Sequence, residues 1–184
     1  MIKVGDQIPA ATLMEYSEVE GGGCSLGPNP VDVRKASVGK TIALFALPGA
    51  FTPTCSAKHV PGYVEKFADL KAAGVDEIWC VSVNDAFVMG AWARDQKTAG
   101  KVRMLADGDA VFTKATGLTL DLTGKGMGLR SNRYSMLIKD GKVASLNIPD
   151  GHPKLLHLWP PKLPQAGRLN YQLFGPADSD FLSW

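Results

Sequence analysis

The chain has 184 residues, of which 45% are hydrophobic and 21% are charged, and its formal net charge is +2. These values are typical of one globular domain, and the small charge argues against binding to nucleic acid or to an anionic membrane surface. The first residues lack the apolar segment of a secretory signal, and no apolar run approaches the ~20 residues that cross a bilayer. We therefore expect a cytoplasmic protein that makes no membrane contact.

In chain order, the pattern of apolar residues, glycines and prolines predicts a series of short elements. They are a loop over 20–30, a strand over 41–47, a helix over 55–73, a strand over 77–83, a helix from Asn84-Asp85 through Trp92, a strand over 102–105, a short helix from Asp107 to Gly117, and a hairpin of strands 134–138 and 142–147. The hairpin is the strongest local signal, because its two apolar runs flank an Asp-Gly pair typical of tight primed turns.

The order of these elements indicates the fold class and the domain limits. Strands that alternate with helices and end in a hairpin favour an α/β domain, in which helices flank both faces of a central mixed sheet. We assign this domain to residues 1–149. Residues 150–184 hold several prolines and little periodicity, so we expect an irregular C-terminal tail packed on or beside the domain.

The chain contains three cysteines, namely Cys24, Cys55 and Cys80. An odd and small number is unlike the disulfide framework of a small secreted domain. The sequence has no Cys-x-x-Cys pair, and its three histidines do not stand at zinc-site spacings from any cysteine. We therefore expect no metal and no cofactor. Without further information, each cysteine is expected to be a small buried side chain.

Cys55 stands at the start of a predicted helix, directly after a buried strand and its loop. Unpaired N–H groups in a first helical turn carry partial positive charge, which favours the thiolate, and the thiolate is the nucleophilic form. Thr52 precedes Cys55 by three residues, so its hydroxyl can turn toward the sulfur. Placement alone leaves a reactive cysteine and an inert one equally open.

The segment Pro48-x-x-x-Thr52-x-x-Cys55 resembles the active-site signature of peroxiredoxins, and residues 48–56 are similar to their plant type II and mammalian type V subfamily. Further matching segments follow in order at residues 58–62, 82–88, 105–107 and 133–136. The resemblance covers roughly residues 1–149. It implies a thioredoxin-like fold and a thiol peroxidase that reduces hydrogen peroxide and organic hydroperoxides, with a part in antioxidant defence and redox homeostasis.

The resemblance also implies roles for individual residues. Cys55 would attack the peroxide and become a sulfenic acid, Thr52 would supply a hydroxyl, and Pro48 would shield the sulfur from bulk water. Arg133 would favour the thiolate and donate to the peroxide oxygens, the alternative being a surface cation. His59 follows Cys55 by four residues on the same helical face, and we expect it to have a supporting role, the alternative being a histidine bonded to backbone.

The sequence does not decide which group reduces oxidised Cys55 and closes the cycle. Type V peroxiredoxins carry a resolving cysteine near the C-terminus, whereas this chain has none after Cys80. Cys80 and Cys24 are each either a resolving cysteine or an inert one. The simplest cycle uses Cys55 alone, with glutathione, glutaredoxin or thioredoxin as reductant.

Two other classes of function also fit a cysteine at a helix head. A thioredoxin-like disulfide oxidoreductase needs two cysteines at the helix head, but Thr52 stands where the first would be. A redox sensor or relay that binds partners through oxidised Cys55 is the alternative function. A peroxidase consumes peroxide over many turnovers, whereas a sensor is oxidised once. The resemblance also implies a homodimer, in which Phe51 and Phe87 are either interface residues or ordinary core.

Overall fold

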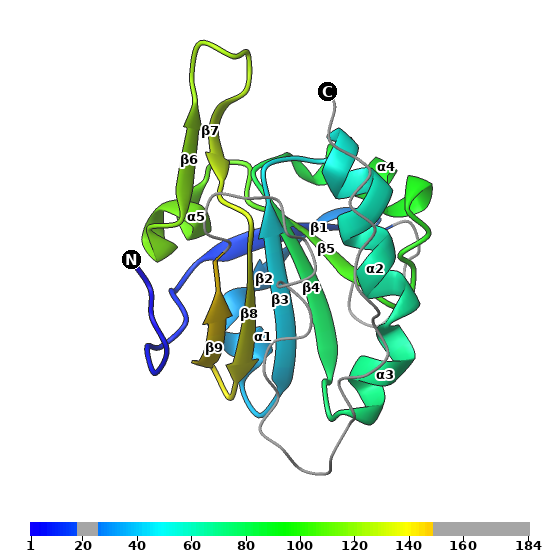
Figure 1. The fold of residues 1–184 in the computed structure, drawn as a ribbon, viewed down its shortest axis with the longest axis vertical. Coiled ribbons are helices and arrows are strands. Elements are labelled where there is room, and N and C mark those ends of the chain that lie inside the picture. The colour runs from blue at the N-terminus through cyan, green and yellow to red at the C-terminus, as the bar shows by residue number, and fades with distance from the viewer. Residues whose placement is uncertain (18–25, 149–184) are drawn as a thin grey trace, which may run out of the picture.

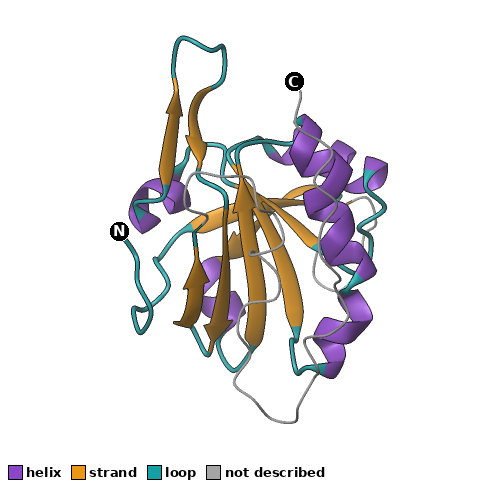
Figure 2. Cartoon of the chain, in the orientation of Figure 1, coloured by secondary structure: helices purple, strands orange, loops and turns teal. Residues whose placement is uncertain are grey.

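The structure, a computed structural model, describes residues 1–17 and 26–148. Seven strands are β1 (Thr12–Ser17), β2 (Gly27–Asp32), β3 (Thr41–Leu47), β4 (Glu77–Ser82), β5 (Arg103–Ala106), β8 (Tyr134–Lys139) and β9 (Lys142–Asn147). They form one mixed sheet in the order β2-β1-β5-β4-β3-β8-β9, with helices on both faces (Figures 1 and 2). The strands β6 (Thr119–Leu122) and β7 (Gly128–Ser131) pair separately and extend from one end of the molecule. The predicted fold class is therefore confirmed.

The helical segments are α1 (Val33–Ser37), the π-helical turn η1 (Cys55–His59), α2 (Val60–Glu65), α3 (Phe67–Ala72), α4 (Ala86–Asp95) and α5 (Val111–Thr116). α1 and α5 border one hydrophobic core, and α2, α3 and α4 border a second. β3 separates the two cores, with Leu44 in the first and Phe45 in the second. Because successive side chains of a strand point to opposite faces, a strand buried on both faces is apolar at nearly every position.

Three strands have their ends near the point where the chain leaves β3. β3 and β4 are parallel, with Leu47 beside Ser82, so both end at the same edge of the sheet. β8 runs antiparallel to β3, with its first residue beside Ala46, so β8 begins at that edge. Arg133, the residue before β8, is thereby brought close to Cys55 although 78 positions separate them in sequence.

Several predicted elements are confirmed in detail. Asp140 and Gly141 have φ angles of 47° and 72°, the left-handed conformation that a tight primed turn requires. The helix expected after Asn84-Asp85 is α4, and the Asp85 side chain caps it by accepting a hydrogen bond from the backbone N–H three residues later. The single helix predicted over 55–73 is instead divided into η1, α2 and α3, with the break at Lys66.

The predicted loop over 20–30 is wrong for its last residues, because β2 begins at Gly27. β2 is an edge strand, and an edge strand tolerates the prolines at 28 and 30 because its outer side needs no N–H donors. Cys24 and the expected tail over 150–184 lie outside the described residues, so the domain limit at residue 149 stays a prediction. Among the described residues, every helix is too short or too polar to cross a membrane.

Candidate active site

Cys55 is fully buried in the first turn of the helix that follows β3, as the sequence predicts. Its carbonyl accepts a hydrogen bond from the Val60 N–H five residues later, which makes η1 a π-helical turn, a form frequent at functional sites. The neighbouring Ser56 hydroxyl lies 3.0 Å from the indole nitrogen of Trp92, which donates to it. This bond ties the head of the helix to α4.

Arg133 contacts the cysteine directly. One terminal nitrogen of its guanidinium donates to the Cys55 sulfur at 3.3 Å, and the other lies 2.8 Å from Nδ1 of His59. The arginine is half-buried. The structure therefore brings Cys55, His59 and Arg133 together, with Arg133 beside the sulfur and not on the outer surface.

His59 is 5% exposed, and its ring lies against the rings of Phe45 and Tyr63. Burial, and then the neighbouring Arg133 charge, lower the pKa of His59 from 6.5 to about 3. A guanidinium only donates hydrogen bonds, so Nδ1 must accept and the ring proton must sit on Nε2. Nε2 has no hydrogen-bond partner among the described residues. His59 is therefore a neutral acceptor that orients Arg133, and not a backbone-bonded histidine.

The lowered pKa of His59 predicts a specific sensitivity to acid. Between pH 6.5 and about 3 the unfolded chain binds a proton at His59 that the folded chain does not. The contribution of His59 to the free energy of unfolding is therefore fully present above pH 6.5. Below that pH, the free energy of unfolding falls by up to about 1.4 kcal/mol per pH unit. His59→Asn keeps an acceptor near the Nδ1 position but cannot be protonated. We expect its free energy of unfolding in urea to fall less with acid than that of the wild type, and parallel pH curves would contradict this.

Thr52 and Pro48 lie in the loop between β3 and the helix. The Thr52 hydroxyl donates to the Gly49 carbonyl at 2.9 Å. Its hydrogen therefore faces the loop, whereas the sequence suggests that it can turn toward the sulfur. Its oxygen keeps lone pairs that can accept a hydrogen bond. Pro48 is half-buried directly after β3. The site thus combines a strand end, a tight loop, a helix head and the residue that precedes β8.

Two side chains that hold this loop were not identified from the sequence. Asn84 belongs to the predicted helix cap and to the matching segment 82–88, and its Oδ1 also accepts a hydrogen bond from the Ala50 N–H at 2.9 Å. The second of these side chains is Arg130. It is half-buried and donates to the Pro48 carbonyl at 3.4 Å. Neither contact has a local sequence signal, because each joins segments far apart in the chain.

Comparison with known proteins agrees with this geometry. A model of the Redoxin family matches residues 3–157. Peroxiredoxin-2B of Arabidopsis thaliana is 45% identical over 150 residues, which cover 82% of this chain and 89% of that protein. The chain belongs to the peroxiredoxins. The chloroplastic Peroxiredoxin-2E of the same plant is 47% identical over 152 residues, which are 82% of this peroxiredoxin and 63% of the longer relative.

Solved structures extend the comparison to the fold. The crystal structure of reduced Prx3 from Vibrio vulnificus in complex with hydrogen peroxide is 48% identical, with a TM-score of 0.75 over 82% of this chain and 90% of that one. The predicted thioredoxin-like fold is confirmed. Peroxiredoxins are thiol peroxidases, so this chain is an oxidoreductase that reduces peroxide with thiols and contributes to antioxidant defence.

In this peroxiredoxin, Cys55 and Cys80 both carry free thiols. Cys80 is fully buried in β4, where its neighbour across the sheet is Phe45 of β3. Burial, and then the proximity of Cys55, raise the pKa of the Cys80 thiol well above its ordinary value. Little of Cys80 is therefore thiolate at neutral pH, which favours the inert alternative for this residue. Cys24, the other possible resolving cysteine, lies outside the described residues.

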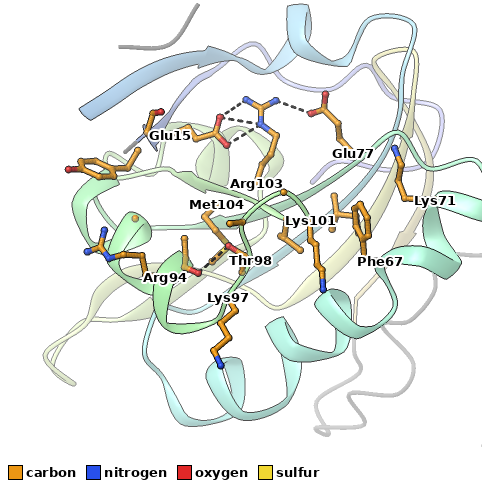
Figure 3. A pocket seen from close by; sticks show the side chains of 18 of the residues that line it. Glu15, Phe67, Lys71, Glu77, Arg94, Lys97, Thr98, Lys101, Arg103 and Met104 are labelled. Atoms are coloured by element: carbon orange, nitrogen blue, oxygen red, sulfur yellow. Dashed lines mark hydrogen bonds and ion pairs between the residues drawn. The ribbon is translucent and has the colours of Figure 1, made fainter. Parts of the chain in front are cut away.

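A cavity of about 690 Å³ lies elsewhere, beside β5 and the end of α4 (Figure 3). On its wall Arg103 donates to Glu15 at 2.6 Å and to Glu77 at 2.8 Å. Burial alone would raise the pKa of Glu77, but hydrogen bonds from Lys40, Arg103 and Trp79 lower it to about 2. None of the predicted site residues that the structure describes lines this cavity. Its ion pairs link neighbouring strands of the sheet and take no part in the cysteine site.

Proposed function

We propose that Cys55 is the peroxidatic cysteine of this enzyme and that an outside thiol closes its cycle. The observation that carries the proposal is the pair of contacts made by Arg133, at 3.3 Å to the Cys55 sulfur and at 2.8 Å to His59. Because His59 accepts one side of the guanidinium, the other side is held against the sulfur. A fixed positive charge there favours the thiolate.

In the proposed step, the Cys55 thiolate attacks one oxygen of hydrogen peroxide or an organic hydroperoxide. A sulfur–oxygen bond forms while the O–O bond breaks, and the second oxygen leaves as hydroxide or alkoxide and then takes up a proton. Cys55 becomes a sulfenic acid. Arg133 stabilises the negative charge as it moves toward the leaving oxygen, and the Thr52 oxygen accepts a hydrogen bond from the peroxide O–H through its free lone pairs. Pro48 keeps bulk water from the sulfur.

The burial and raised pKa of Cys80 support a cycle with one working cysteine among the described residues. In that cycle the thiolate of glutathione, glutaredoxin or thioredoxin attacks the sulfenic sulfur. A mixed disulfide forms as the S–O bond breaks, and the leaving hydroxide takes up a proton to become water. A second thiol, as its thiolate, then attacks the reductant sulfur of the mixed disulfide and displaces Cys55 as a thiolate.

Steady-state peroxide consumption tests the function and the reductant together. We expect turnover with glutathione plus glutaredoxin or with a thioredoxin system, the two being assayed side by side. Cys80→Ser and Cys24→Ser should each keep turnover within about twofold of the wild type, since neither thiol is needed as a resolving group. Loss of turnover in either variant would overturn the one-cysteine cycle. A single round of Cys55 oxidation with no turnover would favour the alternative, a redox sensor or relay.

We further propose a homodimer that works in the cytoplasm. Phe51 and Phe87 are 53% and 64% exposed. Phe87 belongs to α4, and the Phe51 ring lies against Trp92 of the same helix. Large exposed aromatic side chains are typical of a protein interface. The free thiols of Cys55 and Cys80 favour a reducing compartment.

A further inference from the structure

The loop over residues 48–52 is held from outside at two points. The Ala50 N–H donates to Oδ1 of Asn84 at 2.9 Å, and the Pro48 carbonyl accepts from Arg130 at 3.4 Å. Asn84 follows β4 and Arg130 belongs to β7, so the two contacts come from different parts of the fold. Directly after Ala50, Phe51 has a φ angle of 57°, a left-handed conformation that is strained for a bulky residue. A strained loop keeps one shape only when its surroundings hold it.

The Asn84 side chain is itself firmly oriented. Its Oδ1 accepts a second hydrogen bond from the Ser82 hydroxyl at 2.7 Å, and its backbone N–H donates to the Ser82 carbonyl at 2.9 Å. Ser82 is fully buried at the end of β4. With both lone pairs of the amide oxygen in use, Asn84 transmits the position of β4 to the backbone of the loop.

Arg130 is oriented in a similar way. Its Nε donates to the Met127 carbonyl at 2.7 Å, which fixes the plane of the guanidinium. A Cβ added to Gly49 would lie 3.0 Å from a terminal nitrogen of Arg130 and 3.3 Å from the Thr52 methyl carbon. A side chain at position 49 would therefore have to displace either the guanidinium or Thr52, and glycine avoids both contacts.

We infer that Asn84 and Arg130 are positioning residues of the peroxide step, which together clamp the loop so that Pro48 and Thr52 face Cys55 in the reactive geometry. Both act through the loop: Asn84 through the Ala50 N–H and Arg130 through the Pro48 carbonyl. The inference rests on the proposed role of Cys55 in peroxide reduction. A displacement of about 1 Å in groups that orient a substrate slows reactions by about 100-fold, so a loosened loop should be costly.

The test compares two reactions of Cys55 in the full-length protein. Oxidation by hydrogen peroxide in a single turnover depends on how the loop presents the peroxide. Alkylation by iodoacetamide depends on the thiolate and on its accessibility but needs no aligned peroxide. We expect Asn84→Ala and Arg130→Gln each to slow oxidation by about 10- to 100-fold while alkylation changes by less than about threefold. Asn84→Asp keeps an acceptor for the Ala50 N–H and should recover most of the rate.

The matched control is Asn29→Ala, which removes a side-chain bond to a backbone carbonyl in β2, and it should leave both rates unchanged. Both clamp residues act on one loop, so their effects on the oxidation rate should not multiply. The double variant Asn84→Ala/Arg130→Gln should be slowed by much less than the product of the two single fold-changes. Equal slowing of oxidation and alkylation, or oxidation at the wild-type rate in both single variants, would overturn the clamp. A wild-type protein whose Cys55 is not oxidised by peroxide would instead overturn the proposed function.

Discussion

Replacing Cys55 with serine should abolish thiol-dependent peroxide reduction. A serine hydroxyl has no anionic form at neutral pH and no sulfenic acid to offer a reductant, so both halves of the cycle are lost. Removal of a nucleophile of this kind lowers turnover by about 10⁴-fold or more, which here means the uncatalysed background. The measurement is peroxide consumption with the reductant system on which the wild type is most active.

Cys80→Ser is the matched control for this prediction, because it removes the other described thiol from the same core while leaving Cys55 in place. Circular dichroism and urea unfolding should show that both variants are folded. Turnover retained by folded Cys55→Ser would remove Cys55 from the mechanism. Turnover lost equally in both variants would indicate a two-cysteine cycle.

Arg133→Met should have the second-largest effect. Methionine keeps an unbranched side chain of similar reach but removes the charge and both donors, so the sulfur loses its 3.3 Å partner. We expect the peroxide step to slow by about 10²- to 10³-fold, as when one donor is removed from an oxyanion site. Single-turnover oxidation of Cys55 by hydrogen peroxide measures this rate.

Arg133→Lys refines this prediction. A lysine keeps the charge but has no planar fork with which to contact Cys55 and His59 at once, so it should restore only part of the peroxide rate. Arg94→Met, at an exposed position in α4, should leave the rate unchanged. An Arg133→Met protein that is oxidised at the wild-type rate would refute the role of Arg133.

The parts of the fold that the sequence predicts are those specified by local rules. β3 is recognisable because both of its faces are buried, and the hairpin because Asp140-Gly141 adopts left-handed conformations that few residue pairs accept. Cys55 is recognisable because its position at a helix head is a local property. Matching segments in the right order then associate Cys55 with Arg133 without any knowledge of their distance.

The parts that the sequence does not predict depend on tertiary context. β2 contains two prolines, which signal a loop until its place at the edge of the sheet is known. The hydroxyl of Thr52 has two possible acceptors, and only the folded loop decides in favour of Gly49. Asn84 and Arg130 have ordinary alternatives as a cap and as a surface cation. Their contacts with the loop exist only because β4 and β7 end beside it.

The bond between Trp92 and Ser56 has a practical consequence. The indole nitrogen of Trp92 donates to the residue adjacent to Cys55 from a fully buried position. Indole emission depends on local polarity and on hydrogen bonding, both of which change when the neighbouring sulfur gains an oxygen or forms a disulfide. We therefore expect oxidation of Cys55 to change the emission of Trp92, so that this step could be followed in real time without a dye or a coupling enzyme.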